Sequence, residues 1–141
     1  MPSVVVLEIP PRRDHLALVR LVVSGTAAIE RLVPERRMED LRLSVSEACA
    51  NAVDAQQAVG RDEPLAIRIE VDADAIAVTV TDHAGGFEPA ELEPIPSATE
   101  PGRLRHERGL GIPLMRQLAD EVTFTRTADG TAVRLVVKAD G

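Results

Sequence analysis

The chain has 141 residues, a formal net charge of −7 and 45% hydrophobic residues. This length predicts a single domain, residues 1–141, that buries about two-thirds of its unfolded surface. The negative charge and the scarcity of aromatic residues, which are only Phe87 and Phe124, argue against a nucleic-acid-binding protein. No apolar run reaches the length of a membrane span and the N-terminus has no signal-peptide pattern. We therefore expect a cytoplasmic protein without a membrane partner.

The N-terminal half predicts a strand at 4–10, followed by helices at 12–33 and 37–59. Pro34 ends the first helix and Gly60 ends the second. The first helix is expected to face the core through apolar residues at helical spacing: Leu18, Leu21, Val22, Ala28, Ile29 and Leu32. The second is expected to do so through a stripe of mostly small residues: Leu41, Val45, Ala48, Ala52 and Ala55.

The middle of the chain changes character from strands to an irregular segment. Residues 65–71 and 75–82 alternate between apolar and polar side chains, which predicts a β-hairpin. Residues 88–108 contain four of the ten prolines and many charges, without any periodicity. Loops of this length inside a compact domain are typical of lids or binding loops, so we interpret 88–108 as a lid.

The C-terminal part predicts a helix and a second strand hairpin. The helix begins near Gly109–Gly111, with Pro113 in its first turn, and the strands cover 121–127 and 131–137. The helix is expected to face the core through four residues: Leu114, Met115, Leu118 and Ala119. Because the strands come in adjacent hairpins, the order of elements indicates an α+β two-layer sandwich. It consists of a mixed, mostly antiparallel sheet with helices on one face.

A polar pair lies among the small residues of the second predicted helix. Glu47 and Asn51 are four residues apart and therefore share a helix face. An amide oxygen is a suitable ligand for Mg²⁺ that is shared with phosphates, and a neighbouring carboxylate can take a proton from a nucleophile. The simpler alternative is a solvated helix face. The lone Cys49 between them is interpreted as a packing residue rather than a nucleophile, because its neighbours are small and no histidine is close in sequence.

Two glycine-containing segments add further polar chemistry. Asp82 ends a strand before Gly85 and Gly86, where its carboxylate can accept a hydrogen bond from a base amino group, or simply form an Asx turn. Gly109 and Gly111 open a helix, and the free N–H groups of a helix N-terminus favour phosphate. Each segment alone is weak evidence. Their order around one proline-rich loop, together with the polar pair on the helix, favours a nucleotide site.

Taken together, these motifs resemble a known superfamily. "SEACANAV", "TDHAGGF" and "RGLGIPLMRQLADEV" are similar, in order, to the N, G1 and G2 boxes of the GHKL ATPases. The final "DGTAVRLVV" resembles the closing Gly-Thr segment of the same superfamily. The resemblance covers nearly the whole chain and is strongest to anti-sigma-factor serine/threonine kinases of the RsbW and SpoIIAB type. It implies the Bergerat, or histidine-kinase-like, ATPase fold.

The resemblance also implies a role for each matched residue. ATP and Mg²⁺ would be the cofactors, with Asn51 as the metal ligand and Glu47 as the catalytic base. Asp82 would bind the adenine amino group. The remaining nucleotide contacts would come from Gly86 and Thr131 on the adenine side and from Gly109, Leu110 and Gly111 on the phosphate side. Arg108 is the lid arginine expected to stabilise transferred charge, with Arg103 and Arg105 as alternatives.

The implied activity is phosphorylation of a serine on a STAS-domain anti-anti-sigma protein by a kinase that also binds a sigma factor. Many members of the family form homodimers. The sequence departs from the family at Ala84, where the G1 box usually has glycine, and at Ala55, near which a histidine is often found. An alanine at a position that requires positive φ would cost about 1 kcal/mol. These departures leave open an alternative function, a regulator that binds ATP or has lost it and sequesters its partner without phosphorylation, whereas Glu47 argues for the kinase.

Overall fold

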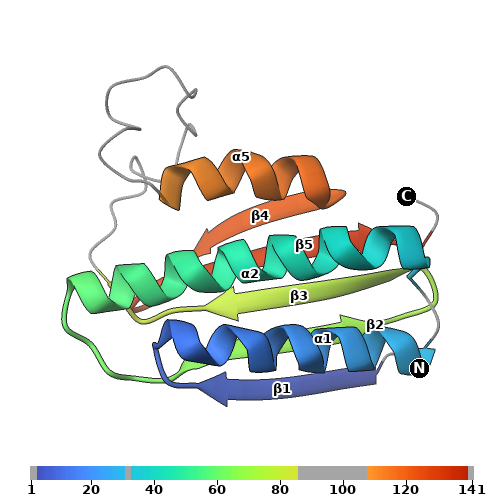
Figure 1. Ribbon diagram of the computed structural model, residues 1–141. Coiled ribbons are helices and arrows are strands. Elements are labelled where there is room, and N and C mark those ends of the chain that lie inside the picture. Colours follow the sequence, from blue (N-terminus) through green and yellow to red (C-terminus); the bar gives the residue numbers. More distant parts are fainter. Residues whose placement is uncertain (1–2, 31–32, 86–107, 140–141) are drawn as a thin grey trace.

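The computed structural model describes residues 3–30, 33–85 and 108–139. Three helices lie on one face of a five-stranded sheet (Figure 1). The elements, in chain order, are β1 (Ser3–Ile9), a short 3₁₀ helix η1 (Arg13–His15), α1 (Leu16–Glu30), α2 (Glu35–Ala58), β2 (Leu65–Val71), β3 (Ala75–Thr81), α5 (Arg108–Leu118), β4 (Glu121–Arg126) and β5 (Thr131–Lys138). No helix within these ranges is long and apolar enough to cross a membrane.

The sheet has the strand order β1-β2-β3-β5-β4. Each of its four strand pairs is antiparallel, and the register places Ile67 opposite Val80 and Val80 opposite Val133. The predicted α+β two-layer sandwich is therefore confirmed, with antiparallel rather than mixed pairing in the described sheet. In this order β1 and β4 are the edge strands, and β5 returns to lie between β3 and β4.

The core lies between the sheet and the helices. In β2 and β5 the apolar residues alternate with exposed ones, as expected for a sheet with one covered face. The predicted stripe of α2 is buried at every position, from Leu41 to Ala55. Small residues on this stripe let the helix approach the sheet closely, so that the β-branched and leucine side chains of the strands fill the core. The largest fully buried apolar side chains are Ile9, Leu41, Leu65, Ile67, Ile69, Ile76, Met115 and Leu135.

The predicted core face of α1 is wrong. Leu18, Leu21 and Ile29 are 43%, 69% and 81% exposed, and the helix is instead buried through Val19, Val23 and Ala27. Ala28 is also exposed, Val22 is half-buried, and Leu32 lies outside the described residues. Apolar residues occur nearly all around this helix, so two stripes satisfy a 3.6-residue period, and only packing decides which one is covered.

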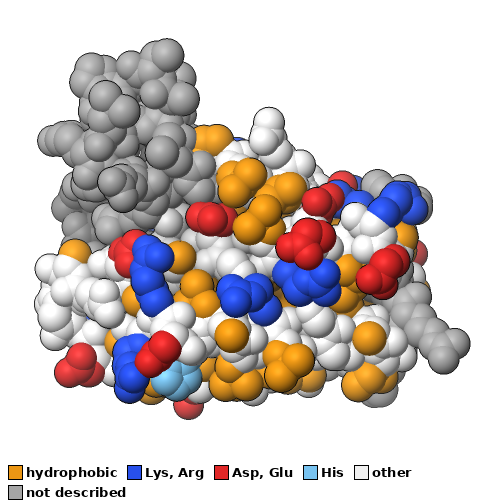
Figure 2. Space-filling model, in the orientation of Figure 1, with side chains coloured by type: hydrophobic (Ala, Val, Ile, Leu, Met, Phe, Trp, Pro, Cys, Tyr) orange, Lys and Arg blue, Asp and Glu red, His pale blue; other side chains and the backbone are white. Residues whose placement is uncertain are grey.

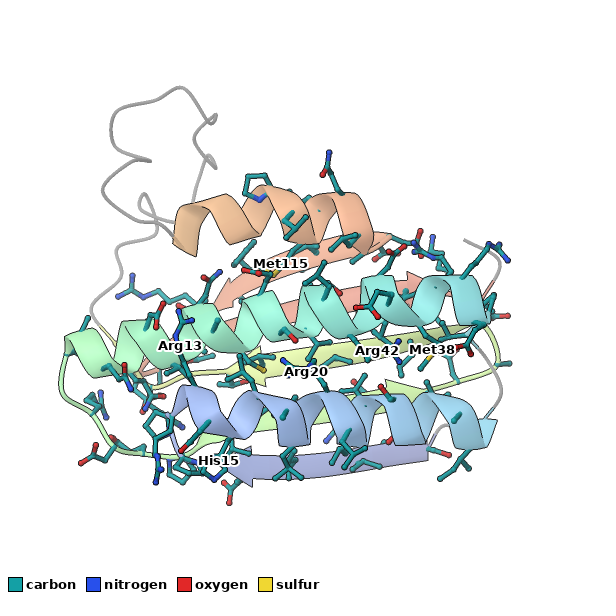
Figure 3. The ribbon with its side chains drawn as sticks, viewed as in Figure 1. Arg13, His15, Arg20, Met38, Arg42 and Met115 are labelled. Atoms are coloured by element: carbon teal, nitrogen blue, oxygen red, sulfur yellow. The ribbon has the colours of Figure 1, made fainter. Side chains whose placement is uncertain are left out.

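Arginines hold α1 and α2 side by side. Arg20 Nη1 donates to Ser46 Oγ at 3.2 Å, and Arg42 Nη1 donates to Ser24 Oγ at 3.4 Å. Figure 3 shows Arg13, Arg20 and Arg42 following one another along the line between the two helices. On the molecular surface, basic side chains form a row on this face, with hydrophobic patches on either side (Figure 2). Helices α1 and α2 are therefore joined by polar contacts outside the apolar core.

The last helix, α5, starts earlier than predicted. It begins at Arg108, so Pro113 lies inside the helix and not in its first turn. Proline has no N–H, so the helix lacks one backbone hydrogen bond at this residue. Met115 is fully buried and Ala119 nearly so, whereas Leu114 and Leu118 are half-buried. The predicted core face is thus confirmed at two residues and partial at the other two.

The position of α5 is secured at its C-terminal end by Arg37, a partly buried arginine of α2. Arg37 Nη1 donates to the carbonyl of Leu118 at 3.2 Å, and Nη2 donates to Asp120 Oδ2 at 3.1 Å. The same Asp120 oxygen accepts the N–H of Lys138 at 2.6 Å. One carboxylate therefore ties the start of α2, the end of α5 and the end of β5 together.

Candidate functional site

The sequence motifs converge at one end of the molecule. The C-terminal half of α2, the end of β3, the start of β5 and the start of α5 all lie at the left of Figure 1. Antiparallel pairing of β3 with β5 places Thr81 opposite Ala132, so the segments that follow β3 and precede β5 meet. The convergence comes from topology, because the motifs are far apart along the chain.

Glu47 and Asn51 are half-buried on α2, and the small residues Ala48 and Ala52 next to them are buried in the core. The polar pair is therefore neither in the core nor on a fully solvated helix face. In this setting a carboxylate and an amide remain accessible to a ligand while being held by a well-packed helix.

A cation that the sequence analysis missed lies near Glu47. Arg13 binds Asp54 through two hydrogen bonds, Nε to Oδ1 at 3.1 Å and Nη2 to Oδ2 at 2.6 Å. The hydrogen bonds and the charge of Asp54 raise the pKa of the Arg13 guanidinium, and the charge of Glu47 contributes in the same direction. The two partners are 41 residues apart, and no local pattern links them. Asp54, which had no predicted role, thus anchors Arg13 against α2.

Asp82 is buried, with 6% of its surface exposed, and is held from two directions. Its Oδ1 accepts the N–H of Ala84 at 3.0 Å and the N–H of Thr131 at 3.2 Å. Its own N–H donates to the carbonyl of Thr131 at 3.0 Å. The Asx turn considered for Asp82 is therefore present, and the same carboxylate also joins β3 to β5. The structure brings together the two residues predicted on the adenine side, Asp82 and Thr131.

Two features of this junction fit a bound base. Thr131 is buried, and its Oγ1 has no hydrogen-bond partner among the described residues. A buried hydroxyl without a partner is costly, so a ligand or water that bonds to it would stabilise the site. Gly130 lies against Asp82 so closely that a Cβ added there would be 2.0 Å from the Asp82 carbonyl oxygen. A glycine is therefore required at the position before Thr131.

The loop after Asp82 has its left-handed residue at Gly85, with φ of 63°. Glycine adopts this conformation at little cost. Ala84 is buried and donates its N–H to Asp82, so the alanine that replaces the usual glycine is accommodated within the Asx turn. Gly86, the other predicted contact of this loop, lies outside the described residues, as do residues 88–107 of the predicted lid.

The phosphate side of the predicted site is described through its backbone only. Arg108, Gly109, Leu110 and Gly111 form the first turn of α5, and the N-terminus of a helix of this length favours anions through its free N–H groups and its dipole. The side chain of Arg108 lies outside the described part of the structure, as do Arg103 and Arg105. The choice among these arginines therefore stays a prediction.

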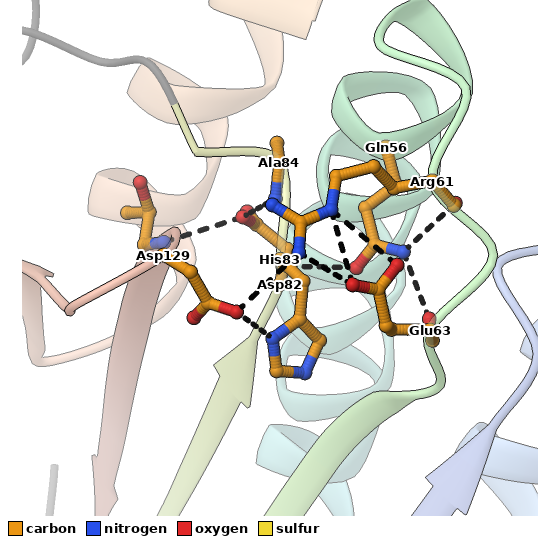
Figure 4. A network of polar contacts seen from close by, with 8 residues as sticks. Gln56, Arg61, Glu63, Asp82, His83, Ala84 and Asp129 are labelled. Carbon is orange, nitrogen blue, oxygen red and sulfur yellow. Dashed lines mark hydrogen bonds and ion pairs between the residues drawn. The ribbon is translucent and has the colours of Figure 1, made fainter.

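A polar network surrounds the loop that carries Asp82 (Figure 4). Gln56, near the end of α2, accepts the N–H of His83 through Oε1 at 2.7 Å. His83 Nδ1 lies 2.9 Å from Asp129 Oδ2, and Arg61 Nη2 lies 3.7 Å from the same oxygen. Glu63 pairs with Arg61 and raises the pKa of its guanidinium. Sequence reasoning missed this network, because its members come from three separate segments.

Two other chemistries receive no support from the described residues. Cys49 is fully buried, and burial raises the pKa of its thiol to about 12, so the reactive thiolate is absent at neutral pH. The interpretation of Cys49 as a packing residue is confirmed. No group of three or more His, Cys, Asp or Glu side chains in residues 3–30, 33–85 and 108–139 is arranged to hold a metal ion.

Comparisons with known proteins agree with this geometry. The family model described as "Histidine kinase-like ATPase domain" matches residues 9–137. The serine-protein kinase RsbW of Bacillus pumilus is 37% identical over 124 residues, covering 82% of this chain and 74% of the relative. The protein of the same name from Bacillus subtilis is 32% identical over 120 residues, with the same coverage.

Solved structures share the fold at low sequence identity. The RsbU and RsbW domains of a Mycobacterium tuberculosis protein match with a TM-score of 0.68 at 15% identity, over 96% of this chain and 32% of that chain. The SiaB-SiaC complex of Pseudomonas aeruginosa matches with a TM-score of 0.65 at 13% identity, over 94% of this chain and 88% of that chain.

The fold and the match of residues 9–137 to the family model define a histidine kinase-like ATPase domain. Within that class the sequence relatives are serine-protein kinases, and the identity to them extends over most of both chains. The chain belongs to the histidine kinase-like ATPase family and, within it, to the RsbW group of serine-protein kinases.

Proposed function

We propose that this chain is an ATP-dependent serine/threonine protein kinase that acts as an anti-sigma factor. The observation that carries the proposal is the junction of β3 and β5. There a buried Asp82 carboxylate lies next to Thr131, whose buried hydroxyl has no partner among the described residues, at the end of the molecule where α2 and α5 meet. The Asp82 carboxylate is held in place by two backbone N–H groups and can accept a hydrogen bond from the adenine amino group.

The other predicted site residues have separate roles in phosphoryl transfer. Bound Mg·ATP supplies the γ-phosphoryl group and the metal charge, while this chain orients it and provides the base. Asn51 would be the protein ligand of Mg²⁺, and Glu47, one turn earlier on the same face of α2, would accept the proton of the substrate hydroxyl. The phosphates would be held by the N-terminus of α5, formed by Arg108, Gly109, Leu110 and Gly111.

The proposed partners are a sigma factor and a STAS-domain anti-anti-sigma protein, whose serine would be the substrate. The resemblance to the RsbW and SpoIIAB type of kinase supports both. The alternative is a regulator that sequesters its partner without phosphorylating it. Glu47 is half-buried next to Asn51, yet its carboxylate makes no hydrogen bond or ion pair with another described residue. A structural role does not explain this carboxylate, which favours the kinase.

Binding of Mg·ATP should raise the melting temperature of the wild-type protein. At a ligand concentration of 100 times Kd the stabilisation is about 2.7 kcal/mol, which corresponds to about 10 °C for a domain of this size. Differential scanning fluorimetry should show most of this shift lost in Asn51→Ala. Glu39→Ala, an exposed position on the same helix, is the matched control and should keep it. The absence of any shift in the wild type would contradict the nucleotide site.

We also propose a homodimer through the β1 edge of the sheet. Val4 and Val6 on the uncovered face of this edge strand are 44% and 60% exposed, and α1, which lies over the same edge, exposes Leu21 and Ile29 (Figure 1). An unblocked apolar edge strand is a template for pairing with a second chain. Edge-to-edge pairing by a second copy would continue the sheet and place Val4 and Val6 beside the same residues of the partner as cross-strand neighbours.

Introducing a lysine at this edge should separate the dimer. Light scattering coupled to size-exclusion chromatography should give twice the chain mass for the wild type and the chain mass for Val6→Lys, because an edge lysine blocks pairing. Thr123→Lys, exposed on the opposite edge strand β4, is the matched control and should remain dimeric. A monomeric wild type, or a dimeric Val6→Lys, would refute the proposed interface.

A further inference from the structure

Gln56 is an unusual residue to find in the core. It is 0% exposed, although glutamine is mostly a surface residue. Its side-chain amide is satisfied by three described hydrogen bonds. Nε2 donates to the carbonyls of Arg61 and Glu63, at 3.2 and 2.8 Å, and Oε1 accepts the N–H of His83 at 2.7 Å. A buried polar side chain whose donors and acceptor are all used is a rigid connector.

The amide connects α2 to the residue directly after Asp82. Figure 4 shows the Gln56 side chain between the loop that follows α2 and the end of β3. On the other side of Asp82, the backbone of Thr131 exchanges hydrogen bonds with it. The Asp82 segment is therefore held between β5 and α2, and on the α2 side the hydrogen bond from His83 N–H to the Gln56 amide joins the two.

We infer that Gln56 is a positioning residue that sets the place of Asp82 relative to α2 and thereby determines the preference for adenine nucleotides. The inference rests on the proposed function, in which Asp82 binds the base while Asn51 and Glu47 on α2 act at the phosphates. A bound nucleotide contacts Asp82 with its base and the polar pair on α2 with its phosphates. The distance between Asp82 and α2 must therefore match the dimensions of the nucleotide. The Gln56 amide holds Asp82 at this distance from α2. The distance matters because recognition of a base by hydrogen bonds is lost when the protein groups are displaced by about 1 Å.

The other contacts of this loop are weaker constraints. The His83–Asp129 hydrogen bond and the ion pairs of Arg61 with Asp129 and Glu63 join partly exposed side chains, and solvent weakens such contacts. The hydrogen bond from His83 N–H to Gln56 ends on a fully buried side chain and is not screened in this way. Removing the Gln56 acceptor therefore releases the loop more than removing any one of the surface charges.

The test compares ATP with inosine triphosphate, which has an oxo group in place of the 6-amino group. In the phosphoryl-transfer reaction, the KM of the wild-type protein for ATP should be at least about tenfold lower than its KM for inosine triphosphate. A site built to accept a hydrogen bond discriminates against a ligand that cannot donate it. Gln56→Met keeps the size of the side chain but removes its amide. This substitution should lower the ratio of the KM for inosine triphosphate to the KM for ATP about tenfold, while kcat at saturating ATP stays within about threefold of the wild-type value.

A matched control separates positioning from stability. Val19→Ala removes buried volume from α1, far along the chain from Asp82, and should lower the melting temperature without changing the ratio of the two KM values. If Gln56→Met does not fold, Gln56→Asn replaces it. Its amide is one methylene shorter and cannot span from α2 to His83 and to both carbonyls, so the same loss of preference is expected.

The outcomes distinguish this inference from the proposed function. A wild type that does not bind ATP refutes the proposed function itself. A wild type that prefers ATP, together with Gln56 variants that keep the full preference and lose only thermal stability, leaves the proposed function standing and overturns the positioning role. Loss of preference in the Gln56 variants but not in Val19→Ala supports it.

Discussion

Replacing Glu47 by glutamine should lower the rate of phosphoryl transfer to a protein serine by about 10²- to 10⁴-fold, the range expected for loss of a general base. Glutamine has nearly the same size and leaves the packing of α2 around Ala48 and Val45 intact. It cannot accept the proton of the attacking hydroxyl. ATP affinity should change little, because the base touches the nucleophile and not the nucleotide. Transfer of radiolabelled phosphate from ATP to candidate STAS-domain proteins measures the rate.

Glu39→Gln is the matched control for this experiment, since Glu39 is an exposed glutamate on the same helix, and it should retain the full rate. The result also separates the two candidate functions. If the wild type binds ATP and its partner but labels no serine, and Glu47→Gln behaves identically, the chain is a sequestering regulator.

Gly130→Ala should abolish measurable ATP binding and destabilise the fold by about 1–3 kcal/mol, the usual cost of inserting a methyl group where there is no space. The added Cβ would be 2.0 Å from the Asp82 carbonyl oxygen and 2.7 Å from Asp82 Oδ1. These atoms belong to backbone and to a carboxylate that is already held by two N–H groups, so neither can rotate away. The start of β5 must move, and Asp82 and Thr131 separate. Isothermal titration calorimetry with Mg·ATP and thermal unfolding measure the two effects.

Gly25→Ala is the matched control for this substitution. Gly25 is an exposed residue within α1, and nothing lies within 4 Å of a Cβ added there. In a helix interior, alanine is better than glycine by about 0.5–1 kcal/mol, so this variant should be slightly more stable and bind ATP as the wild type does. A Gly130→Ala protein with unchanged ATP affinity would show that the junction of β3 and β5 is not the base site.

Much of the fold could be predicted from local pattern. The strands β2 and β3 alternate regularly, and Asp72 closes the hairpin between them by accepting two backbone N–H groups, which also lowers its pKa. The stripe of α2 was predicted correctly because the opposite face of that helix is polar. The face of α1 was predicted wrongly because that helix is apolar on two sides, and periodicity does not say which side the sheet covers.

The candidate site divides in the same way. Residue types and their spacing were enough to single out Glu47, Asn51, Asp82 and the start of α5, because each belongs to a motif of a few consecutive residues. The resemblance to the family added Thr131. The contacts that hold them could not be predicted. Asp82 and Thr131 are 49 residues apart, and Arg13 and Asp54 are 41 apart. Nothing local signals that Gln56 is buried or that Gly130 lies against Asp82.

The sequence by itself thus determined the class of fold, the family and the chemical groups available to the site. These depend on hydrophobic periodicity, turn residues and short motifs, which act over a few residues. Only the tertiary structure decided which face of α1 is covered, that Arg13 binds Asp54, and that Asp82 is held between Thr131 and Gln56. Those features depend on which distant segments pack together, because a buried polar group must find its partner wherever the fold places one.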